Sequence, residues 1–184
     1  MAEYNDTAME VSSRERLIDA ITSASRALVA ISARSLEGIG EEVTLTQYRA
    51  LVVLASRGPL TLTEFARYLM KTPATASRTV DRLVARGLVT RQSSSDDRRQ
   101  VELQLSQEGA DLVHSVTLRR RDAIAEVLRS IPAETLEPLA KVLEDFSTAA
   151  GELPEQEWSL GWEIDQWRTS AQATLHGGET GRTL

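Results

Sequence analysis

The chain has 184 residues, of which 41% are hydrophobic, so it is long enough for one domain with a buried core. It contains no cysteine, which excludes disulfides, thiol redox sensing and thiolate metal sites. With only His114 and His176 as imidazoles and no loop of calcium-site spacing, we expect no metal and no other cofactor. No apolar run is long enough for a membrane span, and the acidic N-terminus lacks the apolar core of a signal peptide, so we expect a cytoplasmic protein.

The net charge of −6 argues against a nucleic-acid partner, but the distribution of charge argues for one. From Thr63 to Arg99, eight Lys and Arg stand against four Asp and Glu, so this segment carries +4 and the rest of the chain −10. Binding depends on the local field rather than on the total charge. Scattered arginines are also typical of a solvated surface, so the order of the predicted elements must decide between a solvated surface and a nucleic-acid interface.

The N-terminal segment predicts a long helix. Ser12 and Glu15 have the spacing of a capping box and precede an apolar stripe with helical period, which indicates a helix over residues 12–37 that ends near Gly38. This stripe is long for a helix near a terminus, so we expect the helix to pack against a large surface.

Two shorter helices are predicted next. The first begins with Thr46 as its N-cap and stops at Gly58-Pro59. Thr61 and Glu64 form a second capping box, and the helix behind it carries apolar residues as far as Met70.

Thr72-Pro73 then predicts the start of a fourth helix, because a capping residue precedes proline at the first helical position. Gly87 marks its end. The expected buried stripe of this helix is Ala76, Val80, Leu83 and Val84. The candidate DNA contacts at its start and on its other face are Lys71, Thr72, Ala74, Thr75, Ser77, Arg78 and Arg82.

These candidates have different expected roles. Arg78 is predicted to contact a base edge, because Arg can bond both acceptors of guanine at once; its alternatives are a phosphate or an intrahelical pair with Asp81. Arg82 is expected to bind a phosphate or to pair with Asp81. Thr75 and Ser77 can contact either phosphate or base, and the helix N-terminus offers backbone N–H groups to a phosphate.

After Gly87 the apolar period changes to two, which predicts a β-hairpin of residues 88–92 and 101–105 with a polar tip. Arg91 in its first strand is a lesser phosphate candidate. Two short helices followed by a basic β-ribbon are typical of a protein that holds a DNA duplex.

The remaining chain is predicted to be mostly helical. Ser106 caps a long helix to about Ser130, and a sixth helix ends at Gly151. Pro138 has no N–H and therefore suits only a first helical turn, so we place the start of that helix near Thr135.

The tail, residues 151–184, differs in composition, because it holds all three tryptophans of the chain. Trp158, Trp162 and Trp167 could close a ligand pocket or brace a dimer; we favour a tail helix that packs on the sixth helix. The final residues have the composition of a disordered end.

Residues 45–109 carry a family resemblance. The motifs are a Thr-Pro-started helix ending in Asp-Arg-Leu-Val-x-x-Gly-Leu-Val, then Asp-x-Arg, then an alternating strand and Leu-Ser-x-x-Gly. Together they resemble the winged helix-turn-helix core of the MarR family of transcription regulators. The resemblance implies a mainly α fold with a small β-hairpin wing (α+β), in which the DNA-binding lobe is embedded between dimerisation helices. The implied segments are an N-terminal dimerisation helix (1–44), the lobe (45–105), C-terminal dimerisation helices (106–150) and the tail.

The resemblance further implies an obligate homodimer in which the first, fifth and sixth helices interlock. Such a dimer binds a pseudo-palindromic operator in double-stranded DNA, with two recognition helices about one DNA turn apart. Most such regulators are expected to be repressors. In the wing motif, Arg99 inserts into or beside the minor groove, Asp97 orients a neighbouring arginine, and Arg98 substitutes for Arg99 if the hairpin register slips by one.

The resemblance also implies an effector, a small aromatic or anionic molecule bound where the first, second and fifth helices meet the lobe. The polar candidates near those elements are Arg16, Tyr48, Arg49 and His114. His114 has the alternative, which we favour, of an ordinary surface histidine.

Other classes of function remain to be weighed. The sequence contains no GxSxG, P-loop, HExxH or Rossmann fingerprint, so we do not expect an enzyme. A winged-helix adaptor that binds protein, or a non-specific DNA-binding protein without an effector, is the alternative. The recognition helix carries Arg78, Arg82 and Arg86, which argues against the adaptor.

Overall fold

The computed structural model describes residues 2–38, 43–93 and 100–159, with the side chains of residues 2–11 and of Glu155 left aside. The chain divides into two compact units. We call Met1–Tyr48 with Asp111–Ile131 the long-helix unit, and Arg49–Ala110 with Pro132–Leu184 the sheet unit. Among the described residues, no helix is long and apolar enough to cross a membrane.

The long-helix unit contains α1 (Ala2–Leu36), the first turn of α2 (Leu45–Arg57) and most of α5 (Gln107–Leu128). The predicted first helix is correct in type but wrong at its start, since Ser12 lies inside α1 rather than capping it. The Tyr48 hydroxyl lies 3.2 Å from the Thr117 hydroxyl, which ties α2 to α5. Buried residues of this unit are Ile31, Ser35, Gln47, Tyr48, Val113, Val116 and Thr117.

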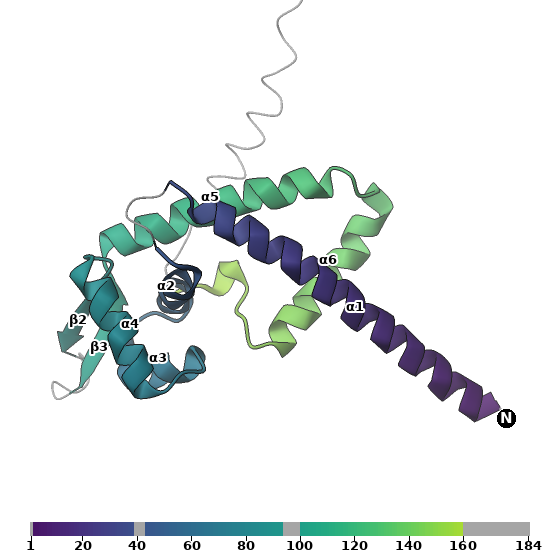
Figure 1. Cartoon of the computed structure of the whole chain (residues 1–184), viewed down its shortest axis with the longest axis horizontal. Helices are drawn as coiled ribbons and strands as arrows, with labels where there is room; N and C mark the ends of the chain where they lie inside the picture. The colour runs from purple at the N-terminus through teal and green to yellow at the C-terminus, as the bar shows by residue number, and fades with distance from the viewer. Residues whose placement is uncertain (1, 39–42, 94–99, 160–184) are drawn as a thin grey trace, which may run out of the picture. The chain divides into compact units, whose positions relative to one another are not determined.

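The sheet unit combines α2 with α3 (Leu62–Tyr68), α4 (Pro73–Ala85) and a three-stranded antiparallel sheet (Figure 1). The strand order is β1-β3-β2, with β2 at Val89–Ser93 and β3 at Val101–Leu105. The hairpin is confirmed, with Arg91 opposite Leu103. The sequence did not predict β1 (Leu60–Thr61), because two residues are too few to show a period.

The core of the sheet unit lies between its helices and the sheet. Phe65 of α3 is the largest of its fully buried side chains, and Leu51 of α2 is among the next largest. The predicted stripe of α4 is confirmed: Ala76, Val80 and Leu83 are buried and Val84 is half-buried. Other buried apolar residues of the unit are Ala50, Val53, Leu54, Ala55, Leu60, Ala66, Leu88, Val89 and Leu103.

The helix boundaries follow local hydrogen bonds. Thr44 caps α2, because its Oγ1 accepts from the Gln47 N–H at 3.2 Å while Gln47 Oε1 accepts from the Thr44 N–H at 3.0 Å. The predicted cap, Thr46, is therefore wrong by two residues; the reciprocal bond to a glutamine was the overlooked signal. The helix before the turn ends at Tyr68, so Met70 lies outside it.

The C-terminal helices also differ from expectation in one detail. Ser106 Oγ accepts from the Gly109 N–H at 3.0 Å, which confirms Ser106 as the cap of α5. However, α6 runs from Ala133 to Ala149 and places Pro138 beyond its first turn. The missing N–H frees the Glu134 carbonyl. Glu134 is exposed, so water can bond that carbonyl and the helix tolerates the proline.

Gly109 marks a close approach between α5 and the chain that enters the sheet. A Cβ at this position would lie 2.1 Å from the Leu88 carbonyl oxygen and 3.2 Å from Leu105 Cδ2. Because the first of these atoms belongs to the backbone, it cannot move aside without shifting the start of β2. The glycine of the Leu-Ser-x-x-Gly motif is thus a packing requirement.

We therefore expect Gly109→Ala to lower the free energy of unfolding by about 1–3 kcal/mol, the usual range for overpacking a buried site. The measurement is denaturant unfolding at one fixed protein concentration. Glu108→Ala, at the exposed neighbouring position, should change stability by less than about 0.5 kcal/mol. Equal stability of Gly109→Ala and wild type would show that the close approach is not real.

Candidate nucleic-acid interface

The start of α4 is fixed by the two residues that the sequence singled out. Thr72 is the N-cap, and its Oγ1 accepts from the Thr75 N–H at 3.3 Å and donates to Thr75 Oγ1 at 3.0 Å. Pro73 follows at the first helical position. The Thr72 hydroxyl thus caps α4 and orders its first turn. Residues 72–75 of this turn are exposed.

The packing of α4 turns its cationic residues outward. Ala76, Val80 and Leu83 are buried at helical spacing, so the opposite face must point away from the core. Arg78 and Arg82 lie four residues apart on that outer face, and both are exposed. The Arg78 Nε donates to the Ala74 carbonyl at 3.3 Å, which keeps the side chain along the first turn of the helix.

The one carboxylate on α4 is paired with a strand residue. Arg91 of β2 donates to Asp81 Oδ1 at 2.5 Å, and both side chains are about half exposed. The pairing of Asp81 with Arg78 or Arg82, considered as an alternative from the sequence, is not what the structure shows. The charges of Arg78 and Arg82 are therefore left unopposed by Asp81, whereas Arg91 is less available to a phosphate.

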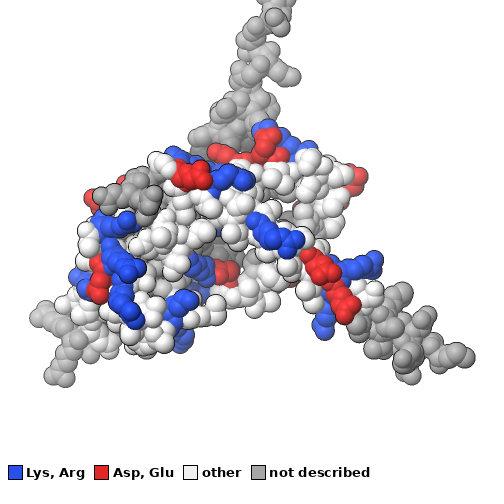
Figure 2. All heavy atoms as spheres, in the orientation of Figure 1, with Lys and Arg blue, Asp and Glu red and all other residues white. Residues whose placement is uncertain are grey.

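Basic side chains gather over the part of the sheet unit where Figure 1 draws α4, as Figure 2 shows. The exposed cations of α3, the turn and α4 are Arg67, Lys71, Arg78 and Arg82. Among the other candidates, Thr72, Ala74 and Thr75 are exposed and Ser77 is half-buried. The structure thus brings these α4 candidates to one end and one face of a single helix.

The helix before the turn is held by a complete capping box. The Thr61 N–H donates to Glu64 Oε2 at 2.9 Å, and the Thr61 hydroxyl bonds the same oxygen at 2.7 Å. The Glu64 N–H donates back to Thr61 Oγ1 at 3.3 Å. The side-chain and then the backbone bond from Thr61 lower the pKa of Glu64, with a smaller contribution from the charge of Arg67. The predicted box is confirmed, and it fixes the entry into α3.

The end of α3 is held by cationic side chains. The Arg57 guanidinium carbon lies 4.0 Å from the centre of the Tyr68 ring, and that of Arg67 lies 5.1 Å from it. Tyr68 is the last residue of α3, directly before the turn to α4. The contact of Arg57 with Tyr68 could not be predicted from sequence, because no local spacing relates the two residues.

The effector candidates are distributed over both units. Tyr48 is buried, whereas Arg16 and His114 are exposed, and these three belong to the long-helix unit. Arg49 belongs to the sheet unit and forms a two-point ion pair with Glu152, with its Nη1 2.9 Å from Glu152 Oε2. An anionic ligand at Arg49 would therefore have to displace Glu152.

The wing candidates Asp97, Arg98 and Arg99 lie outside the described residues. The structure describes the two strands that carry the hairpin tip, up to Ser93 in β2 and from Val101 in β3. Ser93 and Val101 are partners in the ladder, so the tip connects directly paired strand ends.

Comparison with known proteins places the chain in a family. The sequence profile of the MarR family matches residues 42–100. The HTH-type transcriptional regulator YhbI of Bacillus subtilis is 30% identical over 128 residues, which cover 68% of this chain and 83% of YhbI. The chain belongs to the MarR family. It is a transcriptional regulator with a winged-helix fold.

Solved structures support the same family fold. The crystal structure of RV1404 from Mycobacterium tuberculosis is similar to this MarR-family chain with a TM-score of 0.70 and 36% identity, over 76% of this chain and 95% of RV1404. FabT of Streptococcus pneumoniae, crystallised in complex with DNA, shares the fold at a TM-score of 0.63 and 19% identity, over 74% of this chain and 96% of FabT.

The capping box of this MarR-family chain predicts a pH dependence. Because the pKa of Glu64 is lowered by folding, its carboxylate contributes stability above its ordinary pKa of 4.5, and this contribution is lost as the pH falls through the lowered value. Wild type should therefore exceed Glu64→Gln in stability near pH 7 and lose that advantage in acid, as measured by unfolding at stepped pH.

Thr61→Ala is the matched control, since it removes the hydroxyl bond to the same carboxylate. It should lower stability by about 0.5–2 kcal/mol at neutral pH. In the Thr61→Ala background, the substitution Glu64→Gln should also produce a smaller pH-dependent change in stability than it does in wild type. A wild-type advantage over Glu64→Gln that stays constant from pH 7 to pH 3 would contradict the assignment.

Proposed function

We propose that the protein is a homodimeric, sequence-specific repressor that binds a pseudo-palindromic operator through α4 and is released from it by a small-molecule effector. The observation that carries the proposal is the pair of exposed arginines, Arg78 and Arg82, on the outer face of a helix whose inner face is buried. A helix with exposed cations on its outer face, not paired with the carboxylate of the same helix, suits the major groove.

The residues of α4 have distinct proposed roles. Arg78 contacts a base edge, with a guanine as the expected target, because its guanidinium can bond two acceptors in one plane. Arg82, one turn further on, binds a phosphate. At the α4 N-terminus the Ala74 N–H is the proposed backbone donor, since Pro73 has no N–H and those of Thr75 and Ala76 are bonded to Thr72. The further proposed contacts are Lys71, Thr72, Ala74, Thr75 and Ser77 from α4 and its approach, and Asp97, Arg98 and Arg99 from the wing.

The apolar surface of the single chain supports a homodimer. Phe146 of α6 is 49% exposed and Val29 of α1 is 57% exposed, although both are large apolar residues. Apolar residues that cluster on exposed helix faces mark interaction surfaces. Other exposed apolar residues of α1, α5 and α6 are Leu17, Ile18, Leu28, Val127, Leu128, Leu136, Val142 and Leu143.

The effector is proposed to be a small aromatic or anionic molecule, with Arg16, Tyr48, Arg49 and His114 as its candidate contacts. Such a molecule releases DNA only if it binds the DNA-free conformation more tightly than the DNA-bound one. A change in the spacing of the two recognition helices is the conformational difference that the proposal requires.

The roles of the two arginines can be separated by measuring DNA affinity as a function of sequence and salt. Arg78→Ala should reduce affinity for the operator and relax the preference at one base pair, worth about 1–3 kcal/mol of discrimination. Arg82→Ala should weaken binding to all duplexes alike and lower the slope of log affinity against log salt by about 1.

Lys141→Ala is the control, because it removes an exposed cation from α6 that pairs with Asp145 rather than facing DNA in the proposal. It should leave affinity nearly unchanged. If Arg78→Ala and Arg82→Ala both bind like wild type, α4 is not the recognition helix, and a winged-helix adaptor that binds protein becomes the better account.

A further inference from the structure

The chain that follows α6 returns to the DNA-binding lobe. Gly151, with φ +78°, follows α6 in a left-handed conformation. The Glu152 N–H donates to the Ser147 carbonyl at 3.0 Å, and the Gly151 N–H donates to the Thr148 carbonyl. This pattern is a Schellman motif, which closes a helix and reverses the chain. We call the segment Gly151–Ser159 the strap.

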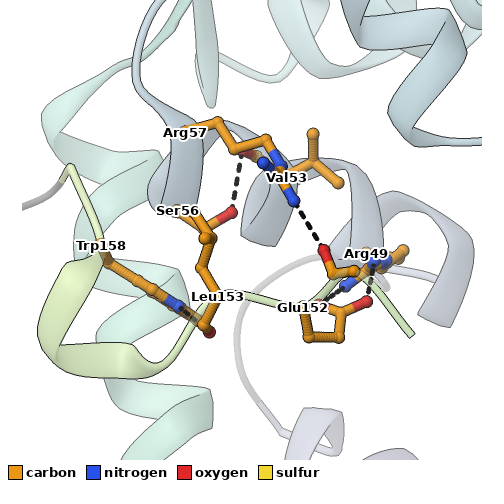
Figure 3. A network of polar contacts seen from close by, with 8 residues as sticks. Arg49, Val53, Ser56, Arg57, Glu152, Leu153 and Trp158 are labelled. Atoms are coloured by element: carbon orange, nitrogen blue, oxygen red, sulfur yellow. Dashed lines mark hydrogen bonds and ion pairs between the residues drawn. The ribbon is translucent and has the colours of Figure 1, made fainter. Parts of the chain in front are cut away.

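The strap is fastened to α2 at three points, and Figure 3 shows the two that Arg49 and Arg57 make. At the first, Glu152 forms a two-point ion pair with Arg49. At the second, Arg57 Nη2 donates to the Gly151 carbonyl at 2.7 Å. At the third, the Ser159 N–H donates to the Ser56 carbonyl at 3.0 Å. These contacts lie at both ends of the part of α2 that belongs to the sheet unit, so the strap contacts the helix at more than one place.

The strap also has internal order. The Trp158 Nε1 donates to the Leu153 carbonyl at 3.1 Å, across a short 3-10 turn at Glu155–Glu157. Ser159 lies close to Gly58: a Cβ added at Gly58 would lie 2.5 Å from the Ser159 Oγ. The described part of the tail thus contacts α2. The tail helix on α6 that the sequence favoured concerns a segment that includes Trp162 and Trp167, and these two residues lie outside the described residues.

The contacts of Arg57 connect the strap to the helix-turn-helix. The same guanidinium that bonds the Gly151 carbonyl lies over the ring of Tyr68, the last residue of α3. Tyr68 directly precedes the turn that leads to the α4 N-cap. A displacement of the strap would therefore disturb the end of α3, directly before the turn to α4.

We infer that the strap is a positioning element for DNA binding and that Glu152 and Arg49 are its positioning residues. The inference rests on the proposed function, in which α6 belongs to the dimer interface. If α6 is held by the partner subunit, the strap ties the DNA-binding lobe to that interface at a second point, besides the covalent path through α5. Fewer orientations of the lobe then remain, so the two recognition helices keep one spacing.

The test compares affinities for the selected operator and for the same operator with one base pair inserted between its half-sites. Glu152→Gln should bind the operator about fivefold more weakly, the upper range for loss of an exposed ion pair. It should also lose part of the preference for the original spacing. Removal of a negative charge alone would strengthen DNA binding, so a loss cannot be an effect of net charge.

Two further variants make the test specific. Glu157→Gln makes the same charge change on an exposed strap residue whose described bonds are made by its backbone, and it should match wild type. The double variant Arg49→Glu with Glu152→Arg rebuilds the pair with reversed charges, and it should restore affinity and spacing preference to within about twofold of wild type.

The outcomes distinguish a failure of the inference about the strap from a failure of the proposed function. Glu152→Gln with the affinity and spacing preference of Glu157→Gln would overturn the inference. A lower melting temperature of Glu152→Gln with unchanged spacing preference would also overturn it, because the pair would then serve only the fold. If wild type itself shows no preference for an inverted repeat, the proposed function fails and the inference fails with it.

Discussion

The burial of one face of α4 is the constraint on which the functional surface depends. Ala76, Val80 and Leu83 are fully covered by the core of the sheet unit, and none of them can turn outward without exposing apolar area. This fixes the rotation of the helix about its axis. Arg78 and Arg82 face outward because the other side is packed, and Thr72 with Pro73 fixes the residue at which the helix starts.

Electrostatics then decides which cations remain available. A chain with a net charge of −6 can present a basic surface only if its carboxylates lie elsewhere or are paired. Asp81 is paired with Arg91, so the acid on α4 is balanced by a strand residue and does not cancel the arginines beside it. An exposed pair of this kind contributes little to stability. The Arg91–Asp81 pair instead helps to keep the α4 surface positively charged.

The sequence predicted best where a structural signal was local. The capping box at Thr61 and Glu64, the Thr72-Pro73 start and the stripe of α4 depend on residues within a few positions of one another, and all were confirmed. Boundaries failed where local signals competed. Ser12 has capping spacing but lies within a helix that begins at Ala2, because nothing in the residues before it stops a helix.

Contacts between distant segments were beyond sequence reasoning. The two-residue strand β1 gains its identity only from its partner β3, and the pairing of Arg91 with Asp81 exists only once β2 packs beside α4. The contact of Arg49 with Glu152 joins residues 103 positions apart. The candidate DNA-binding residues of α4 could therefore be chosen from sequence, but the pairing of Asp81 with Arg91 instead of with Arg78 or Arg82 could not.

The most direct test of the proposed operator binding is a selection of bound duplexes from a random DNA pool at about 150 mM salt, where non-specific binding is weak. The proposed homodimer predicts enrichment of an inverted repeat whose half-sites lie about ten base pairs apart, centre to centre. No enrichment, or enrichment of single half-sites without symmetry, would contradict it.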